Sequence, residues 1–168
     1  MLRRRHSAST AVATVVVLAL PLFTGAGTAH AADSRTGKHH HPTKGQIKAL
    51  FDRWNAALAS GNANRVANLY APDAVLLPTV SSEIRYTRAA RVDYFKHFLE
   101  NKPVGRIQER RIKILSRDDA VDTGLYEFTL TNKDGSKSKV DARYTFVYEW
   151  CRGKWLIVNH HSSAVPTG

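Results

Sequence analysis

Apolar residues recur every three or four positions at the start of the folded part of the chain. The stripe consists of Ile47, Leu50, Phe51, Trp54, Ala57 and Leu58. Because a helix turns once in about 3.6 residues, this spacing predicts a helix with one buried face. Thr43 and Gln46 have the spacing of a capping box at its start, and Gly61 is placed to end it.

Between this helix and the C-terminal half, the pattern of apolar residues changes from helical to strand-like spacing and back again. It predicts a short helix over residues 64–70, a short strand over 74–77 and a longer helix over about 87–101, which Pro103 and Gly105 end.

The C-terminal half alternates between apolar and polar residues, as strands with two different faces do. The alternation predicts strands over residues 106–115, 120–131, 138–150 and 154–161. Asp134 and Gly135 are a strong hairpin signal between the middle two. Helices that come first and an antiparallel sheet that comes last predict an α+β fold, with the helices on one face of a curved sheet.

Both faces of the last strands are partly apolar, so we expect one face to cover the helices and the other to meet a second copy of the chain. In the last strand, strict alternation puts Ile157, Asn159 and His161 on one face and His160 on the other. We therefore expect His161 at the pocket and His160 facing away from it.

Arg143 lies inside a predicted strand, where burial of a lone guanidinium is costly. It needs an anion. Asp141 or Glu127 could supply a carboxylate from the protein, and a ligand carboxylate could equally accept from the guanidinium fork. The residues leave both interpretations open.

Three residues are candidates for proton-transfer chemistry. His161 or Asp122 could act as the base, and Tyr126 could donate a hydrogen bond to a developing oxyanion. Ordinary hydrogen-bonded core residues are the alternative for both His161 and Tyr126. No nucleotide-binding fingerprint occurs in the sequence, so we predict no cofactor.

The N-terminal segment has the three parts of a secretory signal. Arg3–Arg5 form a basic start, residues 11–23 are apolar, and Ala29-His30-Ala31 has the small-residue cleavage pattern. We predict a signal peptide over residues 1–31, a flexible linker over 32–42 and one domain over 43–166. The mature protein is expected outside the cell or in its envelope, with no membrane association after cleavage.

Composition narrows the function further. The chain has 168 residues, a length that favours one domain. Its single Cys excludes a disulfide framework and a multi-cysteine zinc site. Its formal net charge is +11. The basic residues are scattered among acidic ones, so nucleic acid is not an expected partner. A run of three His, His39–His41, lies in the predicted linker without further ligands, and we predict no metal site.

Longer segments carry a resemblance to a known superfamily. They read WNAALASGN from Trp54, LYAPDAVLLPTV from Leu69, ARYTFVYEW from Ala142 and GKWLIVNHHSSAVP from Gly153. These segments resemble the nuclear-transport-factor-2-like superfamily. Within it they resemble the association domain of calcium/calmodulin-dependent protein kinase II and the small bacterial SgcJ/EcaC-type or SnoaL-like proteins. The resemblance covers about residues 44–166.

The resemblance implies a cone, in which a strongly bent antiparallel sheet wraps around the N-terminal helices, with a pocket at the wide end. It also implies dimers or larger rings. By motif position His161 falls on the last pocket His of the kinase association domain, and one of that domain's pocket Arg residues falls at Tyr126. No kinase motif occurs in this chain, so we expect neither kinase activity nor calmodulin binding.

We therefore expect an exported homodimer that binds a small anionic ligand in its cone. The residues expected to contact the ligand are Arg143, His161, Tyr126, Asn159 and Trp54. Two alternatives stay open: a proton-transfer enzyme (an isomerase, dehydratase or cyclase) with His161, Tyr126 and Asp122 at its centre, and a pure oligomerisation module. One feature distinguishes these hypotheses. If Arg143 and His161 open into one cavity, ligand binding or catalysis is favoured over the pure oligomerisation module.

Overall fold

The structure is a computed structural model that describes residues 41–79 and 81–166. The predicted signal peptide and most of the predicted linker lie outside these residues. Within the described part the helices are α1 (Lys44–Ala59), α2 (Ala63–Ala67) and α3 (Arg88–Glu100). The strands are β1 (Tyr70–Leu77), β2 (Val104–Ile114), β3 (Asp119–Thr131), β4 (Lys137–Cys151) and β5 (Lys154–Ala164).

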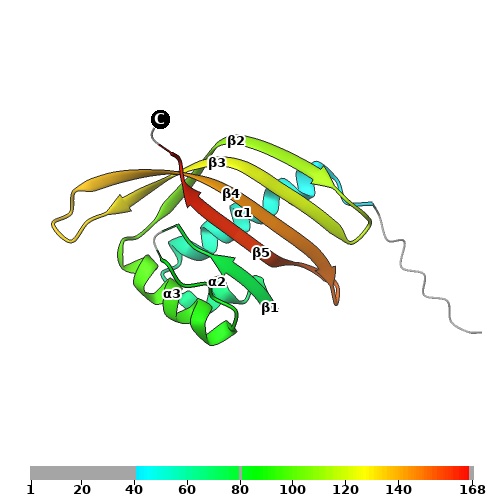
Figure 1. The fold of residues 1–168 in the computed structure, drawn as a ribbon, viewed down its shortest axis with the longest axis horizontal. Helices are drawn as coiled ribbons and strands as arrows, with labels where there is room; N and C mark the ends of the chain where they lie inside the picture. The colour runs from blue at the N-terminus through cyan, green and yellow to red at the C-terminus, as the bar shows by residue number, and fades with distance from the viewer. Residues whose placement is uncertain (1–40, 80, 167–168) are drawn as a thin grey trace, which may run out of the picture. The chain divides into compact units, whose positions relative to one another are not determined.

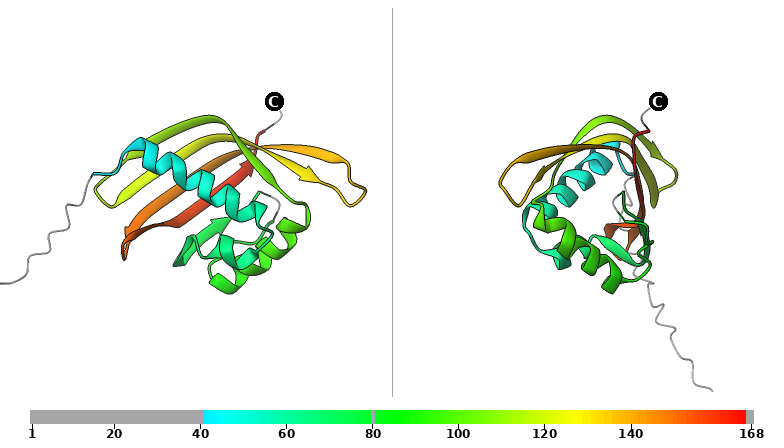
Figure 2. Two further views of the ribbon diagram at one scale, coloured as in Figure 1. Left: turned by 180° about the vertical axis from the view of Figure 1, so that it is seen from behind. Right: turned by 60° about the vertical axis from the view of Figure 1, so that its left-hand side comes forward.

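The strands form one sheet in the order β1-β5-β4-β3-β2. β2 to β5 follow one another as antiparallel neighbours, and β1 pairs with β5 in the parallel direction. The sheet is strongly curved, and α1 lies along its concave side (Figure 1). Figure 2 shows α2 and α3 beside one end of α1, facing the same concave side. The predicted α+β architecture, a bent sheet wrapped around helices, is confirmed.

The predicted stripe forms the buried face of α1. All six of its apolar residues are buried, and the cap at the start of the helix is the predicted capping box of Thr43 and Gln46. The side chain of each cap residue bonds the backbone N–H of the other, at 3.2 Å to Gln46 and 2.7 Å to Thr43. These local bonds and the buried stripe fix where α1 begins and which face it turns to the sheet.

β4 keeps strict alternation over its buried half. Ala142, Tyr144, Phe146 and Tyr148 face the interior and are buried. Arg143, Thr145 and Val147 face the opposite side, which we call the outer face of the sheet. This division agrees with the sequence pattern, because nothing interrupts the pleat in this stretch.

β5 contains a bulge that changes which residues face inward. Tyr148 pairs with Ile157, and the next pair is Val147 with Asn159, so Val158 is an extra residue in β5. One extra residue reverses the alternation beyond it. Ile157 and His160 are consequently both buried, whereas His161 is exposed. The expectation that His160 faces away and His161 faces the pocket was wrong for this reason.

No helix within the described residues is both long and apolar enough to cross a membrane.

Candidate functional site

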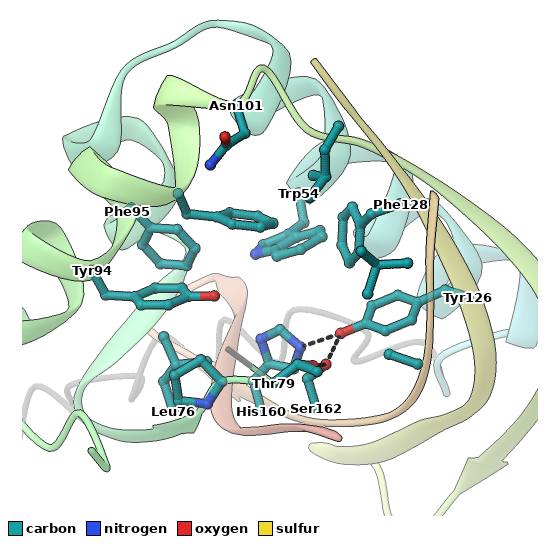
Figure 3. A pocket seen from close by; sticks show the side chains of 15 residues that line it. Trp54, Leu76, Thr79, Tyr94, Phe95, Asn101, Tyr126, Phe128, His160 and Ser162 are labelled. Carbon is teal, nitrogen blue, oxygen red and sulfur yellow. Dashed lines mark hydrogen bonds between the residues drawn. The ribbon is translucent and has the colours of Figure 1, made fainter. Parts of the chain in front are cut away.

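A cavity of about 240 Å³ lies between α3 and the concave side of the sheet (Figure 3). We call it the cone cavity. Its lining consists of Trp54, Leu76, Pro78, Thr79, Tyr94, Phe95, Phe98, Asn101, Tyr126, Phe128, Leu130, Val140, Ala142, His160 and Ser162. The walls are mainly aromatic and aliphatic, and the polar groups are few. Pockets for small molecules have this composition.

A chain of hydrogen bonds runs along the sheet side of the cone cavity. The indole Nε1 of Trp54 donates to the hydroxyl of Tyr70 at 3.1 Å, and that hydroxyl lies 2.9 Å from Nδ1 of His160. On the other side of the imidazole, Nε2 lies 3.5 Å from the hydroxyl of Tyr126. Tyr126 donates to Ser162, and Ser162 is hydrogen-bonded to Thr79. Figure 3 shows the bonds among His160, Tyr126 and Ser162.

The protonation of His160 follows from this chain. Burial, assisted by the neighbouring His161, lowers the pKa of His160 from 6.5 to about 3, so the imidazole is neutral near pH 7. Because Tyr70 already accepts a hydrogen bond from Trp54, its own proton is available to Nδ1. The remaining ring proton then resides on Nε2, the nitrogen on the Tyr126 side. We assign this tautomer from the network.

Tyr94 approaches the cone cavity from the opposite wall, on α3. Its hydroxyl points into the cavity in Figure 3 and has no hydrogen-bond partner within residues 41–79 and 81–166. Burial raises the pKa of Tyr94 and also that of Tyr126 far above the ordinary value of 10.0. Both phenols therefore remain protonated at physiological pH and can donate hydrogen bonds.

The described lining of the cone cavity contains no Arg, Lys, Asp or Glu. Arg143, the expected anion-binding residue, lies on the outer face, where its Nε donates to Ser163 at 3.2 Å. Neither of the carboxylates proposed from the sequence pairs with it. Asp141 accepts from Gln108, and Glu127 is bound by Arg106 and Lys139.

Arg143 and His161 do share a hollow, but it is a different one. They line a groove on the outer face with Glu109, Thr123, Gly124, Leu125, Tyr144, Thr145 and Ser163, which we call the outer groove. Arg143 and His161 lie on neighbouring strands, since Thr145 pairs with His161 and Arg143 with Ser163. These two residues, both expected to contact the ligand in the cone, thus share a groove outside it, on the opposite side of the sheet.

Asp122 occupies a third place, inside the sheet and next to α1. It is fully buried and accepts hydrogen bonds from Arg110 at 3.1 Å and from Tyr144 at 3.0 Å. Burial raises the pKa of Asp122, and the charge of Arg110 opposes that rise. Asp122 does not line the cone cavity, so it is not in contact with the space where a ligand would lie.

Of the expected site residues, the structure brings Tyr126 and Trp54 to the cone cavity. His161, Arg143, Asp122 and Asn159 lie outside its lining. Sequence reasoning did not select His160, Ser162 or Tyr94. The spacing of His160 and Ser162 could have shown that they lie on the same face of the strand, because residues two apart on a strand share a face. The bulge in β5 prevented the sequence from showing that this face points into the cavity.

The described residues contain no group of three or more His, Cys, Asp or Glu side chains arranged to hold a metal ion.

Sequence comparison identifies a family model that matches residues 43–166, and the model describes the calcium/calmodulin dependent protein kinase II association domain. No curated protein is similar to the chain in sequence. A solved association domain of this description from Xanthomonas campestris is 59% identical over 74% of this chain and 90% of its own, with a TM-score of 0.73.

Two more distant structures share the fold. A nuclear transport factor 2-like superfamily protein from Salmonella enterica is 15% identical over 74% of this chain and 92% of its own, with a TM-score of 0.63. A structure described as a scytalone dehydratase, from Novosphingobium aromaticivorans, is 11% identical over 71% of this chain and 82% of its own, with a TM-score of 0.64.

Proposed function

Because the chain belongs to the calcium/calmodulin-dependent protein kinase II association domain family, we propose that it is a self-associating protein that binds a small molecule in its cone cavity. One observation carries the proposal. The cavity has an apolar aromatic wall, and hydrogen-bonding groups from β3, β5 and α3 converge on it. A core side chain usually fills such a space, so an unfilled cavity with directed polar groups favours a ligand.

Self-association is supported by the family and by the outer face. Val121 pairs with Val147 and Thr123 with Thr145 across β3 and β4, and all four side chains are half-buried and lie on the outer face. A surface of small, uncharged side chains at the centre of a sheet suits contact with a second copy of the same sheet.

The proposal includes export. The basic start, apolar run and small-residue cleavage pattern of residues 1–31 are its support. It gives no role to calmodulin, nucleic acid or a membrane surface, because no motif for any of these emerged from the sequence.

Binding accounts for the site better than proton transfer does. A general base that works near pH 7 needs a pKa close to that value. His160, the imidazole in the cone cavity, has its pKa lowered to about 3 by burial, and Asp122 is separated from the cavity. The scytalone dehydratase likeness is at the level of the fold, which does not determine the reaction.

A cavity-filling variant tests the proposal. Ala142 is buried in the cavity wall, so Ala142→Leu adds three carbon atoms to the space where the ligand would lie. We expect small aromatic compounds to raise the melting temperature of the wild-type protein in a concentration-dependent way and to lose this effect in Ala142→Leu.

Arg143→Ala is the matched control, because Arg143 is adjacent in sequence but lies on the outer face. It is expected to retain the full shift. Equal shifts in Ala142→Leu and the wild type would place binding elsewhere, and loss of the shift in Arg143→Ala alone would restore the outer groove as the ligand site.

A further inference from the structure

We infer that the ligand of the cone cavity is an uncharged aromatic molecule with an oxygen that accepts hydrogen bonds from Nε2 of His160 and the hydroxyl of Tyr94. The inference rests on the proposed function and specifies the ligand class. It replaces the anionic ligand that the sequence led us to expect.

The size of the cavity limits the ligand first. An apolar cavity of about 150 Å³ is known to stay dry and to bind benzene. The cone cavity measures about 240 Å³, which is enough for two fused rings with one small substituent. A longer or branched molecule would have to extend past the rim.

The walls favour a flat aromatic ligand. Tyr126 and Phe128 are in edge contact at 4.8 Å between ring centroids, and Phe98 and Phe128 at 5.5 Å. On the α3 side, Tyr94 is stacked on Phe98 at 5.7 Å. Aromatic side chains on both walls can hold an inserted ring by stacking and edge contacts, which adds to the energy of area burial alone.

The charge of the lining excludes an ion. Transfer of a carboxylate or an ammonium group out of water is costly unless an opposite charge receives it. The described lining offers neither a cationic nor an anionic side chain. His160 cannot act as a cation at neutral pH, because burial holds its pKa at about 3.

The polar side chains of the lining include donors that can meet a ligand, beside Thr79, Asn101 and Ser162, which can both donate and accept. Trp54 and Tyr70 direct the proton of His160 to Nε2, and the bond from Nε2 to the Tyr126 hydroxyl is long at 3.5 Å. The proton of Tyr126 is directed to Ser162. Tyr94 contributes to raising the pKa of both Tyr70 and Tyr126, so these three hydroxyls lie within electrostatic reach of one another.

One acceptor oxygen on the ligand can receive a hydrogen bond from each wall, from Nε2–H of His160 and from the hydroxyl of Tyr94. Nε2–H can only donate, and the hydroxyl of Tyr94 has no partner within the described residues, so both can point to one ligand oxygen. A ketone, aldehyde or quinone oxygen fits this description. A hydrocarbon would leave the Tyr94 hydroxyl without a partner and Nε2–H with only its long bond of 3.5 Å to Tyr126, which costs affinity.

Three probes of nearly equal shape test the inference on the wild-type protein at pH 7.5. They are 2-acetylnaphthalene, 2-isopropenylnaphthalene and 2-naphthoate, which carry a ketone, a hydrocarbon and a carboxylate on the same ring system. We expect the ketone to bind about tenfold more tightly than either of the others, measured by titration calorimetry, since two hydrogen bonds contribute about 0.5–1.5 kcal/mol each.

Tyr94→Phe removes one donor and keeps the ring. It is expected to weaken binding of the ketone about two- to tenfold while leaving the hydrocarbon unchanged, and to raise the carbonyl stretching frequency of the bound ketone. Tyr86→Phe is the matched control, because Tyr86 is 59% exposed and does not line the cavity.

The outcomes separate the two proposals. If none of the probes binds, the proposed function itself fails. If the ketone and the hydrocarbon bind equally, or if Tyr94→Phe leaves their ratio unchanged, the cavity binds ligands but the assignment of the donors is wrong. Tightest binding by 2-naphthoate would overturn the uncharged class. The comparison of probes needs no variant, so it holds even if Tyr94→Phe does not fold.

Discussion

His160 is held by three kinds of contact. Its ring is stacked on Phe146 with 4.0 Å between centroids, meets the edge of Trp54 at 5.4 Å, and bonds Tyr70 through Nδ1. Protonation would place a positive charge among these groups with no carboxylate in the cavity lining. The neutral ring is therefore part of the folded state, and in the proposed site it is a fixed donor to the ligand.

This environment predicts an acid-sensitive fold. The pKa of His160 is lowered from 6.5 to about 3, so the unfolded state binds a proton more readily than the folded state between these values. The stabilising effect is complete above pH 6.5 and is lost as the pH falls towards 3. The expected slope from this group is about 1.4 kcal/mol per pH unit at most.

Urea denaturation of the wild type and of His160→Gln between pH 7 and pH 4 measures this effect. His160→Gln should be less stable at pH 7 and should show a shallower loss of unfolding free energy on acidification. His97→Gln, on the exposed side of α3, is the control and should follow the wild type. Parallel curves for His160→Gln and the wild type would contradict the assigned protonation.

Arg91 shows how a single residue fixes one wall of the cavity. It is fully buried on α3, and its guanidinium donates to the backbone carbonyls of Ala71 and Pro72 at 2.8 and 2.9 Å and to that of Ala74. A fourth bond, at 3.1 Å, reaches the carbonyl of Tyr86. These bonds hold β1 against α3, so the α3 wall keeps its distance from the sheet.

At the scale of elements, β2 and β3 approach each other closely at one point. The register between them shifts between Ile107 and Glu109, and Gly124 pairs with Arg110, one position beyond this irregularity. A Cβ atom at Gly124 would lie 2.0 Å from the backbone carbonyl oxygen of Glu109. Only a residue without a side chain allows this pairing, because neither backbone can move away without breaking the ladder.

Gly124→Ala should therefore destabilise the sheet. We expect a loss of about 1–3 kcal/mol in unfolding free energy or more, measured by urea denaturation, since overpacking in well-packed regions has this cost. Gly45→Ala is the matched control, because its nearest new contact would be an ordinary 3.7 Å to Thr43 in the first turn of α1. Equal stability of Gly124→Ala and Gly45→Ala would show that β2 can shift to relieve the contact.

At the scale of the whole molecule, the proposed function gives the two sides of the sheet separate tasks. The concave side encloses α1 and the cone cavity, whereas the outer face carries the outer groove and the half-buried Val121 and Val147. Ligand binding and self-association can therefore be changed independently, by substitutions on neighbouring residues of one strand.

Val147→Glu tests self-association. It places a charge at the centre of the outer face, where two copies would exclude water, so we expect a lower association state than that of the wild type in sedimentation equilibrium. Lys48→Glu, on the exposed side of α1, is a control for added negative charge. A wild-type protein that sediments as a monomer, or a Val147→Glu variant that associates as the wild type does, would contradict the proposed interface.

Local patterns in the sequence determined the elements and many of their faces. Two such patterns are the stripe with the capping box of α1 and the alternation of β4. Each depends on residues within a few positions of each other, so each could be predicted from the sequence. The resemblance extended this to the bent sheet around the helices, and of the residues expected to contact a ligand, Trp54 and Tyr126 line the cavity.

Only the tertiary structure decided the chemistry of the site. The extra residue Val158 in β5 exchanged the roles of His160 and His161, and it follows from pairing with β4 and β1 rather than from the local pattern. The tautomer of His160 depends on Trp54 and Tyr70, which are far from it in sequence. The cavity forms where segments distant in sequence meet, and its charge and the direction of its donors depend on those contacts. Alternation along one strand could therefore not determine them.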